Sequence, residues 1–172
     1  MNRRELLAGA VGVLGLGGGA WYAFGRGSGA RVQPVTVETL DARGSTAGTM
    51  QVPVPGAVTV VDVFSVTCVP CRAELRRLND VRGRLPDGVH LVSVTNDAIG
   101  GTLSRGDVTT WFERYGGHWP VALDDRAQLM RELSVGGLPT LVVVDATGAV
   151  AWSHAGVVSD EALLSAVDGA RG

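Results

Sequence analysis

The sequence predicts an α/β domain in which helices flank a mixed central β-sheet. Strand-like and helix-like segments alternate in the order β-α-β-α-β and then β-β-α, which is typical of this class. Two segments, residues 57–64 and 141–145, are almost continuous apolar runs, as expected for strands that are covered on both faces. The 172 residues are 45% hydrophobic and 19% charged, which suits one folded domain and excludes a disordered chain.

The first strands of the domain precede the central sheet and form an N-terminal β extension. Residues 32–40 alternate enough to predict a strand, and residues 41–49 are rich in turn-forming types. A short second strand is predicted at residues 50–54. A Pro-Gly turn then leads into the run at residues 57–64 (AVTVVDVF), which predicts the central strand.

An amphipathic helix follows the central strand, because apolar residues recur at helical spacing with Arg and Glu between them. These apolar residues are Ala73, Leu75, Leu78, Val81 and Leu85. The remaining predicted elements are a strand at 89–95, a helix near 107–115, a short strand at 119–123, a brief helix at 126–133, strands at 141–145 and 149–154, and a last helix capped by Ser159. Together they predict a single domain without an internal repeat.

The start of the chain has the pattern of an export segment. Arg3 and Arg4 precede a run of 19 uncharged residues (6–24), and this start resembles a twin-arginine signal. As a helix the run would be about 28 Å long, nearly the thickness of the bilayer core. We therefore expect residues 1–31 to be a signal or membrane anchor plus linker. Residues 32–172 would then form a domain outside the cytoplasmic membrane, either secreted or tethered by the N-terminus.

The charged residues exclude several kinds of function. All 15 basic residues are Arg, so chemistry that requires a lysine, such as a Schiff base or a phosphate-binding P-loop, is excluded. The formal net charge is −2, and no basic stripe indicates a nucleic-acid-binding surface. The chain has two cysteines, which are too few for a disulfide framework and require another explanation.

Both cysteines belong to the motif Cys68-Val69-Pro70-Cys71, which lies between a predicted buried strand and an amphipathic helix. A helix N-terminus carries partial positive charge and unpaired N–H groups, so it would stabilise a thiolate at Cys68 and lower the pKa of that thiol. Pro70 has a φ angle that suits the first helical turn. We expect Cys68 to attack a substrate disulfide and Cys71 to resolve the resulting mixed disulfide.

Several stretches of the sequence resemble one protein family. Residues 62–72 (DVFSVTCVPCR) look like the active site of thioredoxins, and residues 136–140 (GGLPT), followed by LVVVD, look like the family's cis-proline loop and next strand. Glu74, three positions after the second cysteine, and residues 115–124 resemble the extracytoplasmic thioredoxins of the TlpA-like group. The match covers about residues 33–170. It implies a thioredoxin fold with an inserted helix and the activity of a thiol–disulfide oxidoreductase.

The resemblance also implies roles for individual residues. Cys68 and Cys71 would form the redox-active disulfide, and no further cofactor would be needed. A cis peptide bond at Pro139 would place the Leu138 backbone beside the cysteine pair, where it could pair with an extended substrate segment. Thr67 stands where the family often has Trp, so the aromatic contact surface beside the first cysteine is smaller.

Two acidic residues complete the predicted site. Asp62 lies among apolar residues of the central strand, where burial would raise its pKa and suit it to accept a proton from Cys71. The alternative is an ordinary polar position on an edge strand. Glu74 matches the acidic residue of the TlpA-like group, and the alternative is that it only stabilises the first turn of its helix.

The predicted activity is net reduction of protein disulfides outside the membrane. Its partners would be disulfide-containing client proteins, an electron donor or acceptor, and the membrane through residues 6–24 if that segment is not cleaved. Two rival functions stay open, a thiol-based metal carrier and a peroxide-reducing thiol enzyme. The three histidines lack zinc-site spacing to the cysteine pair, and the close pairing of two thiols argues against a peroxidase. No metal ligand is therefore predicted.

Overall fold

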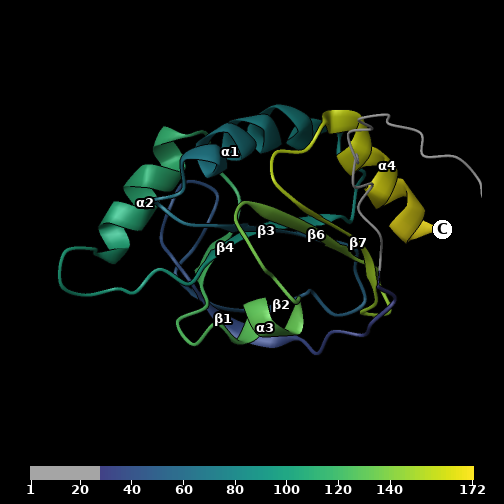
Figure 1. Ribbon diagram of the computed structural model, residues 1–172, viewed down its shortest axis with the longest axis horizontal. Helices are drawn as coiled ribbons and strands as arrows, with labels where there is room; N and C mark the ends of the chain where they lie inside the picture. The colour runs from purple at the N-terminus through teal and green to yellow at the C-terminus, as the bar shows by residue number, and fades with distance from the viewer. Residues whose placement is uncertain (1–27) are drawn as a thin grey trace, which may run out of the picture.

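The computed structural model describes residues 28–172 of the chain. The predicted signal or anchor at residues 6–24 lies outside the described residues. In the described part, helices cover both faces of one seven-stranded sheet (Figure 1). None of the helices in this part is long and apolar enough to cross a membrane. The predicted α/β architecture, with a mixed sheet flanked by helices, is confirmed.

The order of the elements follows the predicted order. The strands are β1 (Val35–Thr39), β2 (Gly48–Val52), β3 (Thr59–Phe64), β4 (His90–Thr95), β5 (Val121–Leu123), β6 (Thr140–Val144) and β7 (Val150–Ala155). The helices are α1 (Val69–Val81), followed directly by a 3₁₀ helix (Arg82–Arg84), α2 (Arg105–Arg114), α3 (Gln128–Glu132) and α4 (Asp160–Arg171). Only the element ends differ from the predicted ranges. For example, β1 starts after Pro34, which has no N–H to donate to a neighbouring strand.

The strands lie side by side in the order β2-β1-β5-β4-β3-β6-β7. β3 is parallel to β4, and β4 is parallel to β5, whereas β6 runs antiparallel to β3. The N-terminal extension, β1 and β2, is antiparallel and joins the sheet at β5. As a result, the carboxyl ends of β3 and β4 and the beginning of β6 lie at the same edge of the sheet.

The two faces of β3 contribute to two separate cores, because successive side chains of a strand point to opposite sides. Val60 and Phe64 pack with residues of α1, α2 and α4, and Val61 and Val63 pack with residues of α3. Figure 1 shows α1, α2 and α4 above the sheet and α3 below it. Asp62 has the same parity as Val60 and Phe64, so its side chain lies on the face that α1 covers.

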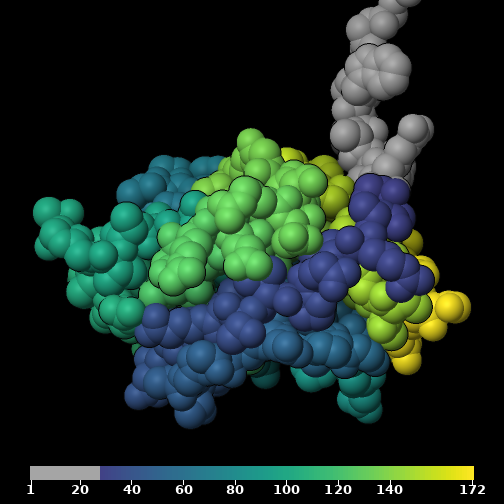
Figure 2. Space-filling view, turned by 90° about the horizontal axis from the view of Figure 1, so that it is seen from below, coloured from purple at the N-terminus to yellow at the C-terminus, as the bar shows by residue number. Residues whose placement is uncertain are grey.

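The chain enters the domain along the edge strand β7. The backbone N–H of Gly29 donates to the Val150 carbonyl at 3.2 Å, and the Val150 N–H donates to the Ala30 carbonyl at 3.0 Å. The Val32 N–H donates to the Gly148 carbonyl at 2.8 Å. From there the N-terminal segment crosses the lower face of the domain beside α3 (Figure 2). The last residues of the predicted linker are therefore hydrogen-bonded to the domain.

Candidate active site

The cysteine pair lies at the N-terminus of α1. Cys68 is the N-cap residue, and its Sγ accepts a hydrogen bond from the backbone N–H of Cys71 at 3.2 Å. The two sulfurs are joined in a disulfide. Cys71 is only 1% exposed, whereas Cys68 is partly exposed and its neighbour Val69 is 67% exposed. One sulfur is thus open to a second molecule at the positive end of a helix, and the other is shielded.

A carboxylate from another loop holds the segment before Cys68. The Ser65 hydroxyl donates to Asp97 Oδ1 at 2.7 Å, and the Val66 backbone N–H donates to Asp97 Oδ2 at 2.9 Å. The Thr67 N–H donates in turn to Ser65 Oγ at 3.2 Å. Asp97 follows β4 and Ser65 follows β3, and these parallel strands end at the same edge of the sheet. No local sequence pattern marks Asp97, because only the pairing of the two strands brings it to this loop.

Asp62 is buried beneath α1. It is 1% exposed and pairs in register with Ser93 of β4 and Leu141 of β6. The edge-strand alternative is wrong, because β3 has a partner strand on each side. Burial raises the pKa of Asp62 to about 7, against a hydrogen bond from Ser93 that lowers it, and the charge of nearby Glu74 raises it further.

A hydrogen-bonded chain continues from Asp62 through Ser93 to Trp119. The Ser93 hydroxyl donates to Asp62 Oδ2 at 2.7 Å. The indole Nε1–H of Trp119 donates to Ser93 Oγ at 2.9 Å. Neither Ser93 nor Trp119 was assigned a role from the sequence. Their arrangement depends on the register between β3 and β4 and on the position of the segment before β5, which no local pattern reveals.

Glu74 lies in the second turn of α1 and is 1% exposed. Its Oε2 accepts a hydrogen bond from the backbone N–H of Val158 at 2.9 Å. The reading of Glu74 as a first-turn acid is wrong, because the first turn of α1 contains no acidic residue. Burial raises the pKa of Glu74, the Val158 bond and the charge of Arg77 lower it, and the charge of Asp160 raises it.

The loop before β6 reaches the same edge of the sheet as the cysteine motif. Thr140, the first residue of β6, pairs with Val63 near the end of β3. The Leu138–Pro139 peptide bond is cis, and the Pro139 carbonyl accepts a hydrogen bond from the Gly156 N–H at 2.8 Å. Leu138 is 37% exposed. The predicted site residues from β3, α1 and this loop therefore gather at one edge of the sheet.

An aromatic cluster lies beside the cysteine motif on the side of α2. Phe64, four residues before Cys68, stacks on Trp111 with 5.2 Å between ring centroids, and Trp111 contacts Tyr115 edge-on at 5.0 Å. The guanidinium groups of Arg72 and Arg76 lie over the Tyr115 ring. The inserted helix thus supplies aromatic surface in a chain that lacks Trp directly before its first cysteine.

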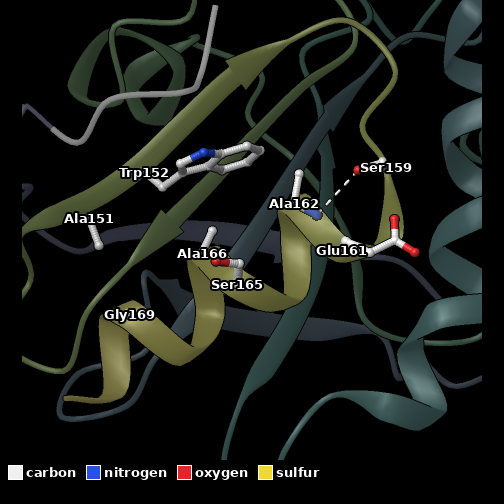
Figure 3. Close-up of a pocket in the computed structure, with 8 residues that line it drawn as sticks. All are labelled: Ala151, Trp152, Ser159, Glu161, Ala162, Ser165, Ala166 and Gly169. Carbon is white, nitrogen blue, oxygen red and sulfur yellow. Dashed lines mark hydrogen bonds between the residues drawn. The ribbon is translucent and has the colours of Figure 1, made fainter.

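A surface pocket between β7 and α4 contains none of the predicted site residues. It has a volume of about 570 Å³ (Figure 3). Its lining residues are Ala151, Trp152, Ser159, Glu161, Ala162, Ser165, Ala166 and Gly169. Within residues 28–172, no group of three or more His, Cys, Asp or Glu side chains is arranged to hold a metal ion.

Comparisons with known proteins agree with this architecture. StoA from Bacillus subtilis is similar to the chain with a TM-score of 0.63 and 20% identity, over 78% of this chain and 98% of StoA. The exposed lipoprotein thioredoxin Etrx1 from Streptococcus pneumoniae has a TM-score of 0.65 and 19% identity, over 79% of this chain and 98% of that chain. A secreted disulfide oxidoreductase from Mycobacterium tuberculosis, homologous to E. coli DsbE, has a TM-score of 0.61 and 18% identity, over 78% and 94%.

These likenesses confirm the predicted thioredoxin-like fold. No curated protein sequence matches the chain significantly. The sequence model of the family described as Redoxin matches residues 28–170, which is nearly the whole described part. This match shows that the chain belongs to the Redoxin family. Together with the fold and the cysteine pair at the N-terminus of α1, it identifies the chain as an oxidoreductase of the Redoxin family with a thioredoxin-like fold.

Proposed function

We propose that this protein is an exported thiol–disulfide oxidoreductase that reduces disulfides of client proteins through Cys68 and Cys71. The observation that carries the proposal is the unequal exposure of two sulfurs at one helix N-terminus. Cys71 is 1% exposed, and Cys68 is accessible beside the exposed Val69. Such a pair offers one thiolate to a client and keeps the second thiol for the intramolecular step.

The reaction begins from the dithiol. The Cys68 thiolate attacks one sulfur of the client disulfide, the client S–S bond breaks, and the first client sulfur leaves as a thiolate. The Cys71 thiol then loses its proton, and its sulfur attacks the Cys68 sulfur. The mixed disulfide breaks, the second client sulfur leaves, and the Cys68–Cys71 disulfide forms. Two electrons pass to the client, so the cysteine pair itself is the redox group and no further cofactor is required.

The surrounding residues support this sequence of steps. Asp62 would accept the Cys71 proton, because its pKa of about 7 suits a base near neutral pH. Glu74 would tune the charge beside Asp62. The exposed Leu138 backbone would pair with an extended client segment, as an added strand does at a sheet edge. An unidentified electron donor would return the disulfide to the dithiol.

Export is the second part of the proposal. It rests on Arg3 and Arg4 before the uncharged run of residues 6–24, which would target or tether the domain outside the cytoplasmic membrane. Two proteins of similar fold are described as secreted and as an exposed lipoprotein. Reduction is favoured over oxidation by the resemblance of Glu74 and its surroundings to the TlpA-like group.

The test is a trapping experiment in native cells with the full-length tagged protein. Cys71→Ser should accumulate reducible mixed disulfides with client proteins, because nothing remains to resolve them. Cys68→Ser should trap little, and it serves as the matched control. Adducts with Cys68→Ser but not with Cys71→Ser would reverse the assignment of the two sulfurs. No adduct with either variant, together with stoichiometric metal in the unmutated protein, would favour a metal carrier instead.

A further inference from the structure

We propose that Ser93 and Trp119 are positioning residues that fix which oxygen of the Asp62 carboxyl receives a proton, and that this oxygen is Oδ1. The role of that proton in turnover rests on the proposed function. The placement of the proton rests on geometry alone. It follows from three buried side chains and from which of their atoms can donate a hydrogen bond.

The three side chains form one hydrogen-bonded chain that joins β3, β4 and the segment before β5. Asp62 and Ser93 are paired in the β3–β4 register, so their side chains lie on the same face of the sheet. The Ser93 Oγ lies 2.7 Å from Asp62 Oδ2, and Trp119 Nε1 lies 2.9 Å from Ser93 Oγ. All three residues are 3% exposed or less, so bulk water has little access to compete for these hydrogen bonds.

The direction of each hydrogen bond is determined by the atoms involved. An indole Nε1–H can only donate, so Ser93 Oγ must accept from Trp119. A hydroxyl carries one hydrogen, and the Ser93 hydrogen is directed at Asp62 Oδ2. Oδ2 is therefore an acceptor whether Asp62 is charged or neutral. When Asp62 takes up a proton, Oδ1 is the oxygen left to bear it.

This arrangement prepares Asp62 for the resolving step. As the Cys71 S–H bond breaks, an O–H bond forms at Oδ1, and the freed sulfur electron pair attacks Cys68. The hydrogen bond from Ser93 to Oδ2 persists through the transfer, so the carboxyl group need not rotate or exchange partners. Because the donor chain is built before the reaction, it adds no reorganisation to the proton transfer.

The charged and titratable groups that face Asp62 are few. The Glu74 carboxyl, on α1, acts on Asp62 through its charge. Cys71, on the same helix, is part of the disulfide here and becomes a titratable thiol only in the reduced protein. From β4 and β6, the residues opposite Asp62 are Ser93 and Leu141, which carry no charge. A change at Ser93 therefore alters a hydrogen bond without altering the charge around Asp62.

The experiment reads the Asp62 carboxyl directly by infrared difference spectroscopy of the full-length protein. The protonated C=O band is isolated by subtracting the spectrum of the Asp62→Asn variant. If Oδ2 is the carbonyl oxygen, it accepts the Ser93 hydrogen bond, and this bond lowers the frequency of the C=O stretch. Ser93→Ala should then raise the frequency of the band, and Ser93→Thr, which keeps the hydroxyl, should restore it. Trp119→Phe removes the donor to Ser93 Oγ, so the Ser93 hydroxyl can rotate away from Asp62. In this variant the Asp62 C=O band should lie between those of the wild type and Ser93→Ala.

A pH titration of the same Asp62 band gives a second measurement, the acid dissociation constant of the carboxyl group. Ser93→Ala removes a donor that favours the charged carboxylate, so the acid dissociation constant of Asp62 should fall by about tenfold, one pKa unit. Ser93→Thr should titrate like the wild type. If Ser93→Ala does not fold, Ser93→Cys, a weaker donor, should shift the band and the titration in the same direction by less.

The results can distinguish the proton placement from the proposed function, because neither the infrared band nor the titration requires a client protein. A band that stays at its wild-type frequency in Ser93→Ala would overturn the proton placement. A shifted band in a protein that traps no client would leave the placement standing and overturn the proposed function. In turnover assays Ser93→Ala should move the pH dependence in the wild type but not in an Asp62→Asn background. A shift in both backgrounds would contradict the positioning role.

Discussion

Two buried carboxyls of the domain, one in the sheet and one in α1, differ in their hydrogen bonds. Both Asp62 and Glu74 are 1% exposed. Asp62 accepts from the Ser93 side chain, whereas Glu74 accepts from the Val158 backbone N–H, which belongs to the segment before α4. The Asp62 bond joins two strands that are already paired through their backbones. The Glu74 bond joins α1 to a segment 84 residues away, so it ties distant parts of the chain together.

The charged groups around the two carboxyls also differ. Arg77 lowers the pKa of Glu74 against the effect of burial, whereas no cation contributes to the pKa of Asp62. With a pKa of about 7, Asp62 is suited to exchange a proton near neutral pH, whereas Glu74 is hydrogen-bonded to the distant Val158 N–H. We therefore propose that proton transfer depends chiefly on Asp62 and that chain anchoring depends chiefly on Glu74.

The largest expected effect is on stability, at Asp62. Its pKa is about 7 in the folded protein and near the ordinary value of 3.8 when unfolded. Between these values the folded state holds a proton that the unfolded state has released, so stability is full below about pH 4 and falls as the pH rises to 7. At about 1.4 kcal/mol per pKa unit, the loss approaches roughly 4 kcal/mol. Asp62→Asn should escape this loss.

Urea unfolding of the oxidised protein at a series of pH values measures this difference. The wild type and Asp62→Asn should have similar free energies of unfolding at pH 4, and the variant should be the more stable at pH 8. Ser93→Thr, which leaves the carboxyl in place, is the control and should follow the wild-type curve. Parallel curves for the wild type and Asp62→Asn from pH 4 to 8 would remove the basis for treating Asp62 as the proton acceptor.

Local patterns in the sequence were sufficient for the fold and for part of the site. The apolar run of β3 and the spacing of apolar residues along α1 predicted the central strand and its helix, because each pattern reflects the surface that its own element buries. The ends of the helices and strands were predicted less accurately. The brief helix predicted at residues 126–133 is shorter in the structure, since Ala127 and Ser134 adopt left-handed backbone conformations on either side of α3.

The residues that surround the site escaped prediction for a different reason. Asp97, Ser93 and Trp119 reach the site through strand register and through the meeting of two loops at one sheet edge. Similarly, the partner of Glu74 is a backbone N–H in a distant segment. No periodicity or motif encodes such pairings, because they exist only once the sheet has assembled. A polar residue such as Ser93 inside a buried strand is nevertheless a signal that a partner faces it.

The second prediction separates anchoring from charge at Glu74. Glu74→Ala should lower the free energy of unfolding by about 1–3 kcal/mol, because it leaves the buried Val158 N–H without an acceptor. Glu74→Gln keeps an acceptor oxygen and should recover most of that loss. Chemical denaturation of both variants at neutral pH provides the measurement. If the two variants lose equal stability, the charge of Glu74 matters more than its bond to Val158.

The smallest expected effect is at Arg77, the cation on the helix side. Arg77 forms an ion pair with Asp160, and Arg84 forms a second ion pair with the same carboxylate. Both pairs are partly exposed, so each is worth about 0–1 kcal/mol. Arg77→Gln should therefore change stability little.

Because the charge of Arg77 lowers the pKa of Glu74, removal of that charge should raise the pKa of Glu74 further. Arg84→Gln removes a similar charge and should leave the titration of Glu74 unchanged. Carboxyl titration followed by NMR distinguishes these outcomes. An equal response to both substitutions would mean that Glu74 senses the general charge of the surface, and the contrast between the two buried carboxyls would then rest on their hydrogen bonds alone.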